Sequence, residues 1–234
     1  MRLLTLAASL VIASASMLIN GNARAQSLPP NFASPPGDLE TGSGNGRADA
    51  TIYFPQMRFP LETGPAFANS QVYRAGGMHG PAGDQCASAN YSYPWRDVYC
   101  EKRSWTMALC PAGKGHQGQD IRPATCKKDT HWAVAADDGV IANIGTYSVT
   151  LQTANGVLYR YLHLNIGDLA VDELDHVKKG ARIGKVSNWF GDTSTTIHLH
   201  FDIKGTVQVN GKSVVTYLPP YTSLVASYKT LMSP

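Results

Sequence analysis

The sequence carries little charge and lacks several motifs that would identify common protein classes. Charged residues make up 16% of the 234 residues, and no run of adjacent basic residues exceeds two. Nucleic-acid binding needs a concentrated positive surface, so this composition argues against such a partner. The motif H-E-x-x-H is absent, which excludes the usual helical zinc-protease site. No C-x-x-C pair occurs either, so a zinc ribbon or a thiol redox motif is not expected.

After the first 25 residues, no stretch is long and apolar enough to span a membrane. The beginning of the chain differs. Met1-Arg2 is basic, Leu3 to Ile19 is apolar, and Ala23-Arg24-Ala25 offers small residues at a cleavage site. This order predicts a secretory signal peptide at residues 1–25, with a retained membrane anchor as the alternative. After cleavage we expect a nearly neutral chain from Gln26 to Pro234 with no stable membrane insertion.

Cysteine is scarce but even in number. The four residues are Cys86, Cys100, Cys110 and Cys126. In an exported protein they predict two disulfides, with three possible pairings, and a location in an oxidising compartment. We expect Cys110 to pair with Cys126, which would close a loop around Gly113 to Asp120, and Cys86 to pair with Cys100.

The residue composition and the hydrophobic pattern change along the chain. Residues 26–50 are rich in Pro, Gly, Ser and Asn and predict a flexible linker, whereas residues 51–110 hold many aromatic residues without a helical period. From Trp132 onward, short apolar runs alternate with turn signals such as Asn155-Gly156, and only Pro220 to Leu231 is typical of a helix. These patterns predict a mainly β fold: an antiparallel sheet core, an irregular disulfide-containing N-terminal region packed on it, and a short C-terminal helix.

The stretch from Thr195 to Asp202 is predicted to be a strand. Side chains alternate along a strand, so His198 and His200 would lie on one face with Asp202, while the apolar residues between them would face the core. Two histidines in this arrangement suit a metal site mounted on a sheet. The alternative is two exposed histidines that bind no metal. The choice between these interpretations depends on residues elsewhere in the sequence.

Two other motifs supply candidate residues. His116 and Asp120 form an H-x-x-x-D within a glycine-rich loop, and His163 lies at the end of a predicted strand. Catalytic zinc needs three N or O ligands and an open position, which His116, Asp120 and either His198 or His200 would supply. The remaining histidines would orient water or stabilise an oxyanion. Spacing alone does not decide which of His198 and His200 binds the metal.

The order of four motifs resembles the lysostaphin/LytM-type zinc peptidases. These motifs are Gly-His-x-Gly-x-Asp, Tyr-x-His-Leu, Val-Lys-x-Gly-x-x-Ile-Gly and His-Leu-His-Phe-Asp, at Gly115–Asp120, Tyr161–Leu164, Val177–Gly184 and His198–Asp202. Each motif is weak alone, but their order on a β-rich exported chain is specific. The resemblance covers Ala112 to Tyr221 and implies that residues 111–234 form a LytM-type metallopeptidase domain.

The resemblance also implies the roles of the site residues. His116, Asp120 and His200 would bind one Zn²⁺ per chain in a groove, while His163 and His198 would position the water and stabilise the tetrahedral intermediate. The implied activity is hydrolysis of peptide cross-links in cell-wall peptidoglycan, with stem peptides as substrate. A periplasmic location would favour the bond between D-alanine and a diamino acid, making the enzyme a D,D-endopeptidase. Asp202 is a candidate partner for a ligand imidazole.

Several alternatives stay open. The protein could be a non-catalytic regulator that binds the wall or a partner protein on the same fold, or a peptidase acting on proteins. Trp189 and Phe190 would flank a stem peptide or simply pack within their loop. Residues 51–109 would cover the groove or only stabilise the core. For the other histidines, at positions 79, 131 and 176, we expect no role in the chemistry.

Overall fold

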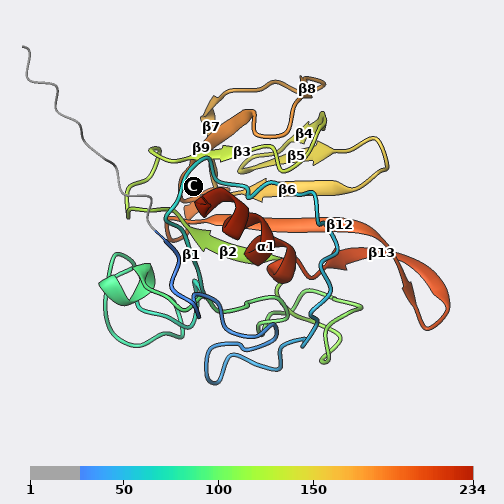
Figure 1. Cartoon of the computed structure of the whole chain (residues 1–234). Coiled ribbons are helices and arrows are strands. Elements are labelled where there is room, and N and C mark those ends of the chain that lie inside the picture. The colour runs from blue at the N-terminus through green and yellow to red at the C-terminus, as the bar shows by residue number, and fades with distance from the viewer. Residues whose placement is uncertain (1–26, 234) are drawn as a thin grey trace, which may run out of the picture.

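The second half of the chain forms strands where apolar and polar residues alternate. In β5 (Ser148–Gln152) and β6 (Leu158–Leu162) every second side chain is buried, as expected for strands with one face on a core. Figure 1 shows the computed structural model, which describes residues 27–233. The predicted signal peptide lies outside the described residues. Within residues 27–233, no helix is long and apolar enough to cross a membrane.

The main sheet is antiparallel throughout and has the strand order β1-β2-β12-β6-β5-β4-β8, with β13 paired to β12 (Figure 1). Its remaining strands are β1 (Phe67–Ala68), β2 (Gln119–Arg122), β4 (Gly139–Ile144), β8 (His176–Val177), β12 (Leu199–Val209) and β13 (Lys212–Leu218). The predicted turn at Asn155-Gly156 joins β5 to β6, with Gly156 at a positive φ of 80°. The predicted antiparallel β core is therefore confirmed.

Two smaller sheets complete the β structure. One has the order β3-β9-β7, formed by β3 (Trp132–Val134), β9 (Arg182–Val186) and β7 (Leu164–Leu169). The other is a hairpin of β10 (Trp189–Phe190) and β11 (Thr193–Ser194). A 3-10 helix, η1 (Ser88–Tyr91), lies in the N-terminal region, and α1 (Tyr221–Met232) confirms the predicted C-terminal helix.

Helix α1 and the irregular N-terminal region share one aromatic core. The ring of Tyr228 on α1 lies 4.5 Å from Trp95 and 4.8 Å from Phe59, measured between centroids. The Tyr228 hydroxyl accepts the backbone N–H of Ala66 at 2.9 Å and lies 2.8 Å from the hydroxyl of Tyr93. Because Trp95 and Phe59 are fully buried, the region before β2 is part of the same hydrophobic core as the sheet.

Residues 27–50, for which the composition predicts a flexible linker, make buried contacts with the rest of the described structure. Phe32 is 3% exposed, and its backbone pairs with Trp95 through an N–H···O bond of 2.7 Å. Further along, Gly37 donates its N–H to the carboxylate of Asp97 at 2.9 Å. A glycine- and proline-rich segment can thus be ordered when a few side chains and backbone groups find buried partners. The predicted domain boundaries, including the linker at residues 26–50, stay predictions.

The predicted disulfide pairing is wrong. The bonds join Cys86 to Cys126 and Cys100 to Cys110. The fold places Cys126, in the loop after β2, beside Cys86 and places Cys110 beside Cys100. A disulfide requires Cα atoms about 4.4–6.8 Å apart, which Cys86–Cys126 and Cys100–Cys110 meet at 5.4 and 5.3 Å.

The strand predicted from Thr195 begins later than expected. β12 starts at Leu199, so Thr195 to His198 form a connection between β11 and β12. His198 keeps one backbone link, donating its N–H to the carbonyl of Ser187 at 3.3 Å. Its placement therefore depends on contacts other than strand pairing.

Candidate metal and catalytic site

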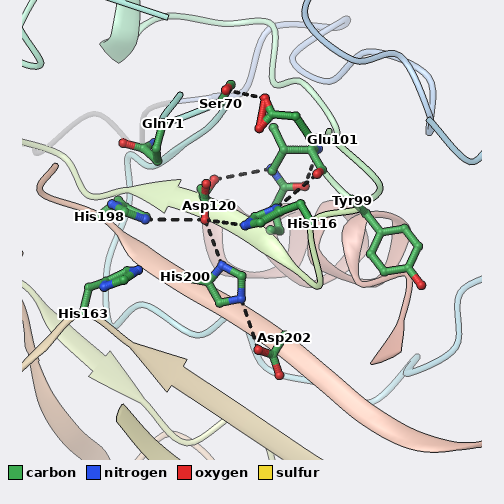
Figure 2. A network of polar contacts seen from close by, with 12 residues as sticks. Ser70, Gln71, Tyr99, Glu101, His116, Asp120, His163, His198, His200 and Asp202 are labelled. Carbon is green, nitrogen blue, oxygen red and sulfur yellow. Dashed lines mark hydrogen bonds and ion pairs between the residues drawn. The ribbon is translucent and has the colours of Figure 1, made fainter. Parts of the chain in front are cut away.

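The pairing of β2 with β12 brings the first two candidate residues together. Asp120 on β2 lies opposite His200 on β12, and His200 lies opposite Leu162 at the end of β6, next to His163. Residues opposite one another in antiparallel strands have side chains on the same face. The sheet register alone therefore gathers Asp120, His200 and the end of β6 (Figure 2).

Glycines let the loop carrying His116 approach the sheet closely. A Cβ added at Gly118 would lie 2.3 Å from the carbonyl oxygen of Phe201, and one at Gly115 would lie 2.7 Å from Cys100. Gly115 also has a φ of 159°, at the edge of the left-handed region that glycine tolerates. The loop is thus irregular and glycine-dependent, in line with the interpretation of H-x-x-x-D as a loop motif.

His116, Asp120 and His200 converge on one point. One ligand atom from each lies within 4.8 Å of the others, and all three residues are buried. The Oδ1 atom of Asp120 is 3.4 Å from Nε2 of His116 and 3.0 Å from Nδ1 of His200. Two imidazole nitrogens and one carboxylate oxygen are the donor types that catalytic zinc uses, so the residues fit the implied metal.

The outward nitrogens of the two histidines are also held. Nδ1 of His116 lies 3.1 Å from the carbonyl oxygen of Val98, and Nε2 of His200 lies 3.1 Å from Oδ2 of Asp202. An imidazole that donates one N–H to an oxygen presents the lone pair of its other nitrogen to the metal position. The candidate partnership of Asp202 with His200 is therefore present in the geometry.

Charges in the site shift the pKa values of its groups in opposite directions. Burial raises the pKa of Asp120, but the neighbouring imidazoles of His116 and His198 outweigh this and hold it well below its usual range. Burial lowers the pKa of His200, whereas hydrogen bonds to Asp120 and Asp202 outweigh this and raise it to about 9. Without a metal ion, His200 is thus the cation that balances the Asp120 carboxylate.

The negative charge of Asp202 is balanced by an arginine. Arg160 on β6 makes a two-pronged contact with its carboxylate, with Nε to Oδ1 at 2.8 Å and Nη2 to Oδ2 at 2.6 Å. Burial raises the pKa of Asp202, but its hydrogen bonds to His200 and Arg160 lower it overall. A buried carboxylate with a bidentate arginine stays ionised and keeps a fixed orientation.

His163 and His198 lie beside the cluster with their ring centroids 4.6 Å apart. His163 adopts a positive φ of 66° between β6 and β7, an uncommon conformation for a residue other than glycine. Its Nδ1 contacts the carbonyl oxygen of Trp189 at 2.8 Å, and Nδ1 of His198 contacts that of Thr196 at 2.8 Å. Burial lowers the pKa of both histidines, so both are neutral at neutral pH.

The exposed hairpin of β10 and β11 borders His163. Besides the Trp189 carbonyl contact, the ring of Phe190 lies 5.4 Å from His163 and 5.1 Å from Tyr147. Trp189 and Phe190 remain 37% and 43% exposed, so part of each ring stays available at the edge of the site. The other histidines lie elsewhere: His79 packs against Tyr73, and His131 contacts Thr125.

Several site contacts come from residues that sequence analysis did not single out. Val98 acts through its backbone carbonyl, which leaves no signal in the sequence. Glu101 is fully buried next to His116 and is held by Ser70 and Arg103, but its position in the sequence resembles that of an ordinary surface acid. Gln71 contacts the segment before His198 (Figure 2). All these residues precede β2.

Comparison with known proteins gives a family for part of the chain. Residues 114–214 match the model of peptidase family M23. A search of curated proteins found no match.

Similar solved structures include lysostaphin and LytM-named proteins. The lysostaphin catalytic domain from Staphylococcus simulans is 22% identical, with 56% of this chain and 90% of that chain covered and a TM-score of 0.40. A candidate glycyl-glycine endopeptidase LytM from Ruminococcus gnavus is 21% identical, with 48% and 47% covered and a TM-score of 0.39, so the match spans about half of that protein. A complex of SpoIIIAH and SpoIIQ is 16% identical, with 68% and 96% covered and a TM-score of 0.41. The segment 114–214, which contains all the histidine and aspartate residues of the cluster together with His163 and His198, belongs to peptidase family M23.

Proposed function

We propose that this protein is an exported zinc endopeptidase that hydrolyses the peptide cross-links of cell-wall peptidoglycan. The observation that carries the proposal is the convergence of His116, Asp120 and His200 within 4.8 Å, inside a segment of peptidase family M23. The neutral pair of His163 and His198 beside this cluster supports a catalytic site over a purely structural one.

The cluster would hold one zinc ion through Nε2 of His116, Oδ1 of Asp120 and Nδ1 of His200. Three protein ligands leave a position open, as catalytic zinc sites require. Zinc bound in such a site lowers the pKa of a coordinated water to about 7 and polarises a carbonyl group. Val98 and Asp202 keep the two imidazoles oriented toward the metal position.

His163 and His198 would move protons and bind the developing charge. Each donates its Nδ1–H to a backbone carbonyl, so Nε2 of the neutral ring carries a lone pair that can accept a proton from water. The protonated ring can then hydrogen-bond the oxyanion of the tetrahedral intermediate and return the proton to the leaving amine. The carbonyls of Trp189 and Thr196 fix both rings for these steps.

The proposed substrate is the stem peptide of peptidoglycan, with the scissile bond between D-alanine and a diamino acid. The two disulfides are typical of an oxidising compartment, which together with the predicted signal peptide supports a periplasmic location. The partly exposed rings of Trp189 and Phe190 beside His163 offer an apolar flank for the peptide. A regulatory protein partner remains compatible with this proposal.

Purified sacculi provide the test. The mature protein should release muropeptides from sacculi, a chelator should stop the release, and added zinc should restore it, because the hydrolysis depends on the metal. Mass spectrometry of the fragments should show cleavage between D-alanine and the diamino acid. A variant at the exposed His176 serves as an active control. If no chelator-sensitive fragments appear, the proposed activity is wrong, and a non-catalytic binding role or a protein substrate takes its place.

A further inference from the structure

The short connection that carries His198 lies outside the strands that flank it. Residues 195–198 follow β11 and precede β12. Two backbone bonds hold this connection, from Thr195 N to Asn188 O at 2.9 Å and from His198 N to Ser187 O at 3.3 Å. The backbone N–H of Ile197 and the side chain of Thr196 are bound instead by two glutamines from the N-terminal region.

Gln71 holds His198 through Thr196. Its Oε1 atom accepts a hydrogen bond from the Thr196 hydroxyl at 2.6 Å, while the Thr196 carbonyl oxygen accepts from Nδ1 of His198 at 2.8 Å. Gln71 is 5% exposed, and its Nε2 donates to the backbone of Asn69 at 3.2 Å, which turns the amide oxygen toward Thr196. Figure 2 shows Gln71 next to His198, on the side of the site formed by the N-terminal region.

Gln85 holds the next residue. Its Oε1 atom accepts the N–H of Ile197 at 2.7 Å. The backbone carbonyl of Gln85 in turn accepts from Nη1 of Arg122 at 3.1 Å, on the strand that carries Asp120. Cys86, the residue after Gln85, is joined by a disulfide to Cys126 in the loop that follows β2.

We propose that Gln71 and Gln85 are positioning residues that fix His198 relative to Asp120. Their two amide oxygens hold consecutive residues of the connection, so that Nε2 of His198 points at Oδ1 of Asp120 from 3.5 Å. Arg122 and the Cys86–Cys126 disulfide link Gln85 to β2, the strand that carries Asp120. The same contacts that hold Ile197 therefore also fix the distance between His198 and Asp120. Both glutamines precede residues 114–214, so this support is contributed by the part of the chain outside the family match.

This inference rests on the proposed function for its kinetic consequence. If His198 moves protons in the transition state, loosening its support lowers kcat, because small displacements of a catalytic group cost about 10²-fold in rate. Substrate binding depends on other contacts, so KM should change little. Neither glutamine contacts the three candidate metal ligands in the described residues, so the zinc content should stay the same.

The test uses Gln71→Met and Gln85→Met, because methionine has a similar length but lacks the amide acceptor. Gln85→Glu restores an acceptor oxygen and is the rescue variant, and Gln208→Met in the exposed β12–β13 hairpin is the matched control. Three quantities are measured: kcat and KM on purified cross-linked muropeptide dimers, zinc per chain, and amide hydrogen exchange of Ile197 in the metal-free protein.

We expect each methionine variant to lose kcat by about tenfold or more, with KM within about twofold of the native value and unchanged zinc. In Gln85→Met the Ile197 amide should also exchange at least about tenfold faster, because its acceptor is gone. Gln85→Glu should recover most of both properties, and Gln208→Met should match the native protein. Unchanged kcat in both methionine variants, or unchanged Ile197 exchange in Gln85→Met, would overturn the proposal. If the native protein cleaves no cross-link, the proposed function fails, whereas the exchange measurement still decides whether Gln85 holds the connection.

Discussion

The strands from β2 onward and the largely irregular region before β2 contribute different things to one site. The sheet and its loops carry every candidate ligand and catalytic histidine, from His116 to His200. The region before them supplies groups that orient those residues: the Val98 carbonyl on His116, and Gln71 and Gln85 on the connection to His198. The donors of the candidate metal site therefore lie within the segment that matches the family, while part of their orientation depends on residues that precede it.

The two regions also differ in how they fold. The sheet is held by regular backbone pairing, whereas residues 27–110 have little secondary structure and are held by buried aromatic rings, two disulfides and isolated hydrogen bonds. They nevertheless share one core, because Trp95 packs directly against Tyr228 of α1. This sharing predicts that the irregular region cannot be loosened without weakening the sheet domain.

The largest effect on turnover should come from a catalytic histidine in the part of the chain after β2. His198→Ala should lower turnover about 10²–10⁴-fold, the range for loss of a general acid–base group, while zinc stays bound at the native level. Steady-state kinetics and elemental analysis of the same preparation check this, with His176→Ala as a control at an exposed strand residue. Loss of zinc together with activity would make His198 a ligand, and the proposed difference in role between His198 and His200 would be wrong.

The shared core can be tested at Trp95. This side chain is fully buried, and its indole N–H donates to the carbonyl oxygen of Ala66 at 2.8 Å. Trp95→Ala should lower the free energy of unfolding by about 3–5 kcal/mol, as large-to-small core changes do. Trp105→Ala is the matched control, because Trp105 is 52% exposed and should cost less than about 1 kcal/mol.

Denaturant unfolding followed separately by near- and far-UV circular dichroism measures both variants. The shared core predicts a single transition that shifts as a whole in Trp95→Ala. Two separate transitions, with the sheet signal unchanged, would show that residues 27–110 fold independently of it.

The smallest predicted effect concerns Asp97, which links the two ends of the irregular region. Its carboxylate accepts N–H groups from Gly37 and Tyr99, both at 2.9 Å, and burial raises its pKa to about 7. The folded state therefore holds a proton that the unfolded state releases above pH 3.8. Stability from this group is complete below that pH and is lost as the pH rises to about 7, with a slope of at most about 1.4 kcal/mol per pH unit.

Asp97→Asn cannot titrate, so the difference in unfolding free energy between the native protein and the variant should change over that pH range. Urea titrations at several pH values between 4 and 8 measure it, with the exposed Asp172→Asn as control. A difference that stays constant across this range would contradict the raised pKa of Asp97.

The repetitive parts of the fold were predictable from the sequence. Short apolar runs separated by turn signals predicted the β core, and Asn155-Gly156 marked a hairpin. The resemblance of four motifs selected His116, Asp120 and His200, which the fold does bring together. These features depend on local hydrophobic periodicity or on an ordered set of motifs that rarely arises by chance, so they can be recognised from the sequence alone.

Other features depend on which distant segments meet and were not predictable. The disulfide pairing depends on which loops the fold brings together, since Cys126, in the loop after β2, meets Cys86 rather than Cys110. The packing of Phe32 against Trp95 is likewise not apparent from the Pro- and Gly-rich composition of residues 27–50. Backbone acceptors such as Val98 O have no sequence signature at all.

The zinc content of His116→Ala tests the central claim most directly. His116 supplies Nε2 to the cluster from a loop rather than from a paired strand, so its truncation removes a ligand with little disturbance of the sheet. Elemental analysis of the purified mature protein should find one zinc per chain in the native form and in His176→Ala, and none in His116→Ala, which should also fail to release muropeptides. Stoichiometric zinc in the His116→Ala protein would contradict the assignment of the site.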